Sequence, residues 1–157
     1  MIKQLDKVDR KILELLQTDG RMTVKEISNR LNLSTTPIFE RIKKLERAGI
    51  IDHYSAILNT EKLGKKLTAF AHISLKDHTK ELVREFEEKI LTIPEVMECH
   101  YVTGGADFII KILVKDMDEY KEFVMDKLFE VPNIGNIESY LSLVEKKKTN
   151  VIQFLEE

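Results

Sequence analysis

The sequence predicts an α+β fold, in which an N-terminal (winged) helix-turn-helix domain of three helices precedes a C-terminal ferredoxin-like βαββαβ domain. Two observations support this expectation. In the first fifty residues, apolar positions recur with the period of a helix between residues that cap or stop helices. Beyond residue 66, the apolar period changes in the order strand, helix, strand, strand, helix, strand. That order is typical of a split βαβ sheet with both helices on one face.

The first two helices are marked by their ends. Asp6 is suited to cap the first helix, and Gly20 stops it. Thr23 and Glu26 have the spacing of a capping box, in which each side chain satisfies a backbone N–H of the other residue. The sequence therefore predicts a second helix of about two turns, which ends before residues 32–34.

The third helix is predicted from its cap, its proline and its apolar spacing. Ser34 can cap it, and Pro37 falls in the first turn, where a missing N–H costs nothing. Gly49 ends the helix. Its buried seam follows the spacing i, i+4, i+7 and consists of Ile38, Ile42 and Leu45.

The domain boundary is expected shortly after these helices. Residues 50–58 suggest a short hairpin, and a polar, lysine-containing connector with one glycine follows it. We expect a helix-turn-helix domain over residues 1–60, a linker over 61–66, and a dimerisation and effector-sensing domain over 67–157.

The C-terminal domain is expected to hold four strands and two helices. The strands are expected over 68–76, 96–103, 107–114 and 137–144, and the helices over 79–91 and 118–129. The third strand is apolar on both sides, whereas two helices can cover only one face of the sheet. We therefore expect a homodimer packed sheet against sheet. The alternative is that the hairpin of residues 50–58 covers the open face.

Composition and charge limit the classes of function. Apolar residues make up 43% and charged residues 33% of the chain, a balance typical of a soluble globular protein. No apolar run approaches the roughly 20 residues of a membrane-spanning helix. The single cysteine, Cys99, fits a reducing cytoplasm, and we expect it to be a small core residue. Residues 1–50 hold 11 Lys and Arg against 7 Asp and Glu, whereas the remainder holds 14 against 20, so the basic N-terminal part is suited to a polyanion.

Two short helices, a tight turn and a basic third helix are typical of a helix-turn-helix module, whose third helix lies in the major groove of DNA. Hydroxyl groups at the start of that helix can meet phosphates or base edges, and basic residues at three-residue steps form a flank along it. The residues expected to contact DNA are Arg21, Ser34, Thr35, Thr36, Phe39, Glu40, Arg41, Lys44 and Arg47.

The basic flank also has plainer interpretations. It could be a solvated helix face, and the three-helix domain could bind a protein. Glu40 could accept a hydrogen bond from a cytosine amino group or pair with Lys44, four residues on. Since Arg41 and Lys44 lie off the apolar seam, we expect that replacing either would weaken DNA binding without changing thermal stability.

Catalysis is not expected. Cys99 and His100 are neighbours in a strand and point to opposite faces, so they cannot act as a pair. The four histidines show no spacing with cysteine or carboxylate that suggests zinc. We therefore expect no catalytic residue, no metal site and no cofactor beyond a possible small-molecule effector.

Six features of the sequence resemble the leucine-responsive and asparagine regulator (Lrp/AsnC) family, and within it the bacterial leucine-responsive regulatory proteins. They are residues 5–13, 33–37, 41–51, 54–59 and 98–104, and Asp107. Each motif is modest evidence alone, but their order over roughly 150 residues is specific.

The resemblance implies a transcription regulator that forms homodimers, assembles into octamers or larger discs, bends DNA and responds to amino acids. It places the effector between dimers, near Thr103, Gly104, Gly105, Ala106 and Asp107, with a contribution from Ser139. Asp107 would accept a hydrogen bond from the α-amino group or orient the loop.

Two positions depart from the pattern of the family. Ala106 stands where an aromatic residue normally precedes the aspartate, and Ile137 where threonine is common. We therefore expect altered selectivity rather than tight leucine binding. The alternative is that Gly104 and Gly105 form a plain turn, which would leave a ligand-independent, architectural DNA-binding protein.

Overall fold

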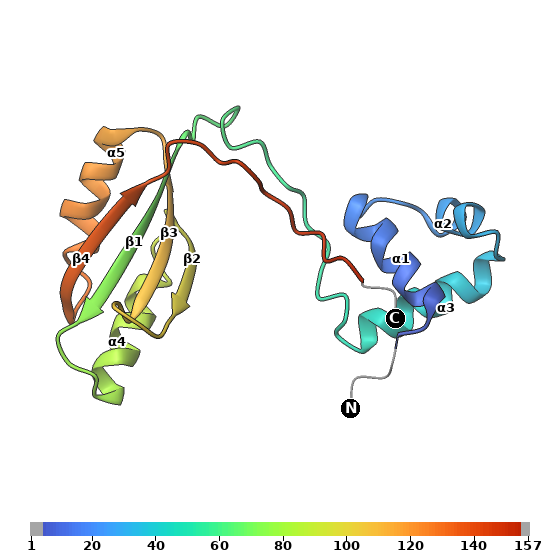
Figure 1. The fold of residues 1–157 in the computed structure, drawn as a ribbon, viewed down its shortest axis with the longest axis horizontal. Helices are drawn as coiled ribbons and strands as arrows, with labels where there is room; N and C mark the ends of the chain where they lie inside the picture. The colour runs from blue at the N-terminus through green and yellow to red at the C-terminus, as the bar shows by residue number, and fades with distance from the viewer. Residues whose placement is uncertain (1–4, 155–157) are drawn as a thin grey trace. The chain divides into compact units, whose positions relative to one another are not determined.

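The computed structural model describes residues 5–154 and divides the chain into two compact units, and Figure 1 labels all their helices and strands except the π-helix. Unit 1 holds the chain up to Ile57 together with the residues from Lys147 onward, and unit 2 holds Leu58–Lys146. The C-terminal residues therefore group with the helical unit, whereas the sequence had placed them in the C-terminal domain. Residues 1–4 and 155–157 lie outside the described part.

Unit 1 contains three helices, as expected. They are α1 (Lys7–Thr18), α2 (Val24–Leu31) and α3 (Thr35–Arg47). Asp6 caps α1 by accepting hydrogen bonds from the N–H groups of its first turn, and Thr23 caps α2 through the expected capping box with Glu26. The local signals in the sequence therefore predicted the starts of α1 and α2 correctly.

One apolar cluster holds these helices together. Each helix contributes side chains that water does not reach, including the expected seam of α3. The fully buried members are Ile12, Ile27, Ile38 and Leu45. Because all three helices share this cluster, the outward face of α3 is held in a fixed position on the unit.

The hairpin expected over residues 50–58 is not formed. Gly49 ends α3 with a φ of 67°, and the described chain from residue 50 to residue 66 contains no helix or strand. Ile57 and Leu58 remain largely exposed. An isolated two-stranded hairpin is only marginally stable in water. Residues 50–66 form no strand that would support a hairpin here.

The C-terminal segment packs on unit 1. Gln17 of α1 exchanges two hydrogen bonds with Ile152, its Nε2 donating to the carbonyl oxygen at 3.2 Å and its Oε1 accepting from the backbone N–H at 2.6 Å. Phe154 packs against the apolar cluster. These contacts explain why the end of the chain belongs to the helical unit.

Unit 2 is an antiparallel sheet in the strand order β2-β3-β1-β4. Its elements follow the expected order: β1 (Leu67–Leu75), α4 (Lys80–Ile90), β2 (Val96–Tyr101), β3 (Phe108–Val114), α5 (Met117–Glu122), η1 (Phe123–Leu128) and β4 (Ile134–Leu141). The second helix differs from the expectation because its latter half, η1, is a π-helix. The last strand begins three residues earlier than predicted.

The two faces of the sheet differ. Inward side chains of β1 and β3 are buried beneath α4, α5 and η1 in one cluster, which Cys99 joins as a half-buried member, as expected. The open face is less apolar than the sequence suggested. Phe70 and Tyr140 lie there beside His72, and Lys111 pairs with Glu98 at 2.8 Å. Among the described residues, no helix is long and apolar enough to span a bilayer.

Candidate DNA-binding and effector sites

The N-terminus of α3 is exposed and has no side-chain cap. Ser34 occupies the cap position without a hydrogen bond to the first turn, in contrast to the capped starts of α1 and α2. Thr35 and Thr36 are also exposed. The first-turn N–H groups and three hydroxyls therefore face solvent together, an arrangement suited to a phosphate oxygen.

Polar and basic side chains continue along the exposed surface of α3. The Lys44 side chain is 52% exposed. Arg47 is exposed, and its Nε donates to the carbonyl oxygen of Lys43 at 3.1 Å. Phe39 is half-exposed, with the ammonium of Lys43 5.8 Å from its ring centroid. Within residues 5–154, Glu40 has no ion-pair partner, so the expected alternative of a Glu40–Lys44 pair is not formed.

Arg41 has a different environment from the rest of the flank. Its Nη1 lies 2.5 Å from Asp6 Oδ2 and 2.6 Å from Asp9 Oδ1. The Asp9 side chain is only 4% exposed, so Arg41 neutralises a buried carboxylate of α1. Hydrogen bonds to Asp6 and Asp9 raise the pKa of Arg41. The hydrogen bond from the backbone N–H of Asp9 is the larger cause that lowers the pKa of Asp6, and the hydrogen bond from Arg41 lowers it further.

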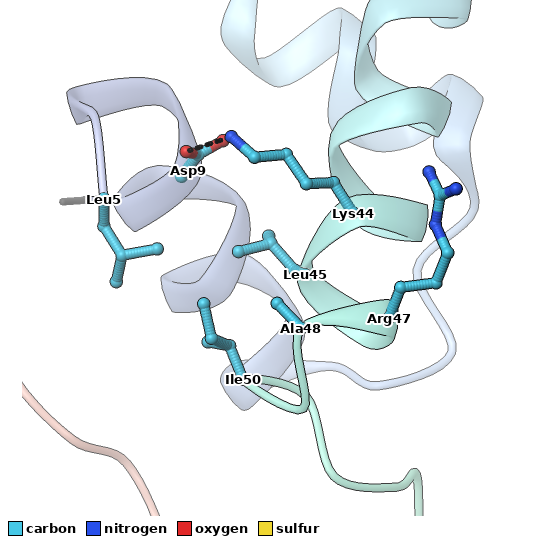
Figure 2. Close-up of a pocket in the computed structure, with 7 residues that line it drawn as sticks. All are labelled: Leu5, Asp9, Lys44, Leu45, Arg47, Ala48 and Ile50. Carbon is cyan, nitrogen blue, oxygen red and sulfur yellow. Dashed lines mark ion pairs between the residues drawn. The ribbon is translucent and has the colours of Figure 1, made fainter. Parts of the chain in front are cut away.

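A small cavity of about 320 Å³ lies beside this ion pair, between the start of α1 and the end of α3 (Figure 2). Lys44 Nζ lies 4.0 Å from Asp9 Oδ2 at its wall, and Arg47 points away from that pair (Figure 2). The remaining lining is apolar and consists of Leu5, Leu45, Ala48 and Ile50. Asp9 therefore interacts with two basic residues of α3, and Arg41 is by far the nearer.

Arg21 is exposed, and its backbone N–H donates to Asp19 Oδ1 at 2.9 Å. This bond fixes the backbone of the turn that leads into α2, while no hydrogen bond or ion pair within residues 5–154 involves the Arg21 guanidinium. The side chain is thus available to a phosphate.

The loop between β2 and β3 holds the effector residues expected from the sequence. Gly104 has a φ of 130°, which favours glycine, and a Cβ at Gly104 or Gly105 would meet no atom within 4 Å. Asp107 Oδ2 accepts a hydrogen bond from the N–H of Leu75 at 2.8 Å, and its Oδ1 lies 2.9 Å from His78 Nε2. Asp107 therefore fastens the loop to the end of β1.

The same bonds set the ionisation of Asp107. The Leu75 amide and then His78 lower the pKa of this carboxyl from its ordinary value of 3.8. Both carboxylate oxygens have partners within the chain, which favours the loop-orienting role over direct binding of an amino group.

A cavity of about 460 Å³, called the polar cavity below after its four polar sheet residues, adjoins this loop on the open face of the sheet. Thr103, Gly105 and Ala106 form one side of it. The sheet contributes the rest, chiefly through the polar residues His72, Ser74, Asn136 and Glu138. The structure thus joins the predicted loop to side chains of β1 and β4.

Ser139 is not part of this cavity. It pairs with Ala71 and faces the helices, where its Oγ accepts a hydrogen bond from the Tyr120 hydroxyl at 2.6 Å. A single copy of the chain therefore does not bring Ser139 to the loop of Thr103–Asp107.

Several residues that lie at these candidate sites in the structure were not predicted from the sequence. They are Lys43 on α3, His78 beside Asp107, and the four polar sheet residues of the cavity. The available signal for the sheet residues was the alternation of polar with apolar side chains around His72 and Ser74 in β1 and around Asn136 and Glu138 in β4, which marks one face of a sheet. Within residues 5–154, no group of three or more His, Cys, Asp or Glu side chains could hold a metal ion.

Both halves of the chain match known families. Residues 5–52 match the family described as winged helix-turn-helix DNA-binding, and residues 68–152 match the Lrp/AsnC ligand binding domain. Together the two matches include most of the residues assigned above to α3, the loop and the polar cavity.

Individual relatives agree with these matches. The chain is 36% identical over 148 residues to the leucine-responsive regulatory protein of Escherichia coli, covering 94% of this chain and 90% of that protein. A transcriptional regulator from Neisseria meningitidis, solved as an L-Met complex, superposes with a TM-score of 0.91 at 35% sequence identity. The match covers 96% of this chain and 97% of that regulator. An AsnC family transcriptional regulator from Agrobacterium tumefaciens superposes with a TM-score of 0.90 at 31% sequence identity. That match covers 94% of this chain and 96% of the other.

Proposed function

The chain belongs to the Lrp/AsnC family of transcription regulators, and from this premise we propose how it binds DNA, assembles and senses an amino acid. The observation that carries the DNA part is the exposed, uncapped start of α3 beside a basic flank. The contacts to DNA are assigned to Arg21, Ser34, Thr35, Thr36, Phe39, Glu40, Lys44 and Arg47. DNA binding also favours a cytoplasmic location.

These side chains divide into two kinds of contact. The hydroxyls of Ser34, Thr35 and Thr36, with the free N–H groups beside them, are suited to phosphates or base edges. Lys44 and Arg47 supply positive charge to the phosphates along the DNA groove. Contact between Arg41 and DNA stays a prediction, because this side chain would have to exchange Asp6 and Asp9 for a phosphate.

The proposed assembly is a homodimer that packs through the open face of the sheet, with octamers formed from such dimers. On that face, Phe70 and Tyr140 keep large accessible surfaces, and Ile109 and Leu113 are only half-buried. Within residues 58–146, the helices pack against the other face. A second copy would remove these side chains from water. Two recognition helices would then read two half-sites of an operator.

The proposed effector is a small amino acid held at Thr103–Asp107, where the loop meets the polar cavity. The Neisseria regulator, solved with L-Met, supports this class of ligand. No catalytic residue is assigned, and no metal or further cofactor forms part of the proposal.

Titration of full-length protein into labelled duplex DNA, at several salt concentrations, tests the DNA assignment. Lys44→Gln and Arg47→Gln are each expected to weaken binding and to reduce the salt slope by roughly one unit. Lys89→Gln, which removes an exposed charge from α4, is the matched control and should change neither quantity. Binding that is insensitive to salt and to both α3 variants would refute the assignment.

A further inference from the structure

One exposed carboxylate, that of Glu138, lines the polar cavity on the open face. Among the described residues that line it, Glu138 is the only one with a carboxylate, and none is lysine or arginine. Its volume of about 460 Å³ falls within the roughly 300–1,000 Å³ of typical small-molecule sites. Within one copy of the chain, a ligand that fills this cavity therefore lies near the carboxylate of Glu138 and near no lysine or arginine of the lining.

Within residues 5–154, no lysine or arginine forms an ion pair with Glu138. Lys111, which lies on the same face of the sheet, is held by Glu98 of β2 at 2.8 Å, whereas Glu138 lies on β4 at the opposite edge. The carboxylate of Glu138 accepts one hydrogen bond, from the Tyr140 hydroxyl at 3.1 Å. It keeps free lone pairs for a donor from outside.

Aromatic rings lie beside this carboxylate. The ring of Tyr140 packs against that of His72, with centroids 4.7 Å apart, and His72 faces Glu138 across the β1–β4 pair. An aromatic face attracts a cation as a carboxylate does, though more weakly. Of the two rings, that of His72 lines the cavity with Glu138, and this end of the cavity is thus suited to a positively charged group.

The loop end of the cavity offers the opposite polarity. Within residues 5–154, no hydrogen bond engages the backbone N–H of Thr103, Gly104, Gly105 or Ala106. Successive free N–H groups in a tight loop form a concave site for an anion such as a carboxylate. Thr103, Gly105 and Ala106 of this loop line the cavity, so its loop side carries backbone N–H groups without a partner and its β4 side carries the Glu138 carboxylate.

We propose that the effector is an amino acid with a positively charged side chain, such as lysine or arginine. Its carboxylate would meet the loop amides, and its side-chain cation would meet Glu138. This inference rests on the proposed function, namely that unit 2 senses an amino acid. A leucine or methionine side chain in the same pose would remove water from Glu138 and return no hydrogen bond, so it is disfavoured. The second copy proposed above would complete the cavity wall.

Isothermal titration of the full-length protein with L-lysine, L-arginine, L-leucine and L-methionine tests the proposal. We expect the basic amino acids to bind at least tenfold more tightly than the neutral pair. Glu138→Gln should weaken lysine binding by at least tenfold and leave leucine binding unchanged. Glu145→Gln removes an exposed carboxylate outside the cavity, and this matched control should bind lysine like the unaltered protein.

Cadaverine, which keeps both amino groups of lysine but lacks the carboxylate, tests the loop end and should bind at least tenfold more weakly than lysine. Tighter binding of leucine or methionine than of lysine would overturn the inference and leave the proposed sensing of amino acids intact. So would a lysine preference that survives Glu138→Gln. Absence of binding by all four amino acids at millimolar concentration would overturn both proposals.

Discussion

Arg41→Gln is expected to destabilise unit 1 far more than Arg47→Gln, although both changes remove a positive charge from the same helix. This corrects the expectation from the sequence that Arg41 can be replaced without a change in thermal stability, because its ion pairs with Asp6 and Asp9 were not visible there. Removing one partner of a buried ion pair costs about 3–5 kcal/mol, because the other charge is left without compensation. Here the Asp9 side chain is 4% exposed, but Arg41 is 31% exposed and Lys44 lies 4.0 Å from the same carboxylate. We therefore expect the free energy of unfolding of unit 1 to fall by about 2–3 kcal/mol, at or below the lower end of that range.

Circular dichroism during thermal and urea unfolding measures this loss. In a domain of this size the loss corresponds to a decrease in melting temperature of roughly 10 °C or more. Arg47→Gln, a surface change, should stay within about 0.5 kcal/mol of the unaltered protein. The double variant Asp9→Asn/Arg41→Gln should be more stable than the two single losses predict, with a coupling of about 1–3 kcal/mol. A loss no larger than that of Arg47→Gln, or strict additivity, would refute the reasoning.

The same variants show whether Arg41 leaves its carboxylates when DNA binds. If the ion pair persists, Arg41→Gln should leave the salt slope of DNA binding unchanged, whereas Arg47→Gln should reduce it by roughly one unit. A slope reduced by one unit in Arg41→Gln would mean that the side chain moves to a phosphate, as the sequence alone suggested. The titrations belong at a temperature where circular dichroism shows each variant folded.

Three further predictions concern the loop, the sheet and the C-terminal segment. The amide of Leu75 and then His78 hold the pKa of Asp107 below 3.8, so the ionised carboxyl stabilises the fold fully above pH 3.8 and loses this contribution as the pH falls through the lower folded-state pKa. Asp107→Asn should thus cost about 1 kcal/mol at pH 7, with the cost disappearing in acid during urea unfolding. Gly135→Ala should destabilise unit 2 by about 1–3 kcal/mol, because the new Cβ would lie 3.1 Å from backbone atoms of Leu75; an unchanged urea midpoint would contradict this. Phe154→Ala should lower the stability of unit 1 by about 1–2 kcal/mol in the same assay, since its ring packs on the apolar cluster, and an unchanged transition would show that the segment is not part of the unit.

The elements that the sequence predicted best are those whose signals are local. Asp6 and Thr23 lie within three residues of the N–H groups they cap, so two helix starts could be identified without tertiary information. The start of β4 was missed because Gly135, its second residue, has no side chain to mark a face. The π-helical second half of the α5 region was missed because its inward residues also fit the α-helical period.

The contacts at these sites that the sequence did not reveal join residues that lie far apart in the chain. The partner of Arg41 is Asp9, 32 residues earlier, and no periodicity of α3 reveals that contact. His72 and Glu138 face each other only because β1 and β4 are adjacent in the sheet, and their register follows from the fold as a whole. The loop of Thr103–Asp107 was recognised through the family resemblance, whereas the cavity beside it required the strand order.

Glu138 and Ser139 are neighbours on β4 that point to opposite faces of the sheet, so replacing each in turn shows on which face the effector lies. Glu138 lines the polar cavity, whereas Ser139 accepts the hydrogen bond of Tyr120 at 2.6 Å on the opposite face of the sheet. If the effector occupies the cavity, Ser139→Ala should leave amino-acid binding unchanged and lower the stability of unit 2 by about 1 kcal/mol, because the Tyr120 hydroxyl loses its partner. Calorimetry and urea unfolding of the two variants separate these effects. Loss of ligand binding in Ser139→Ala alone would instead place the effector on the helix side. Since one copy of the chain does not bring Ser139 to the loop of Thr103–Asp107, the loop would then have to come from a second copy, as in the arrangement between dimers that the family resemblance implies.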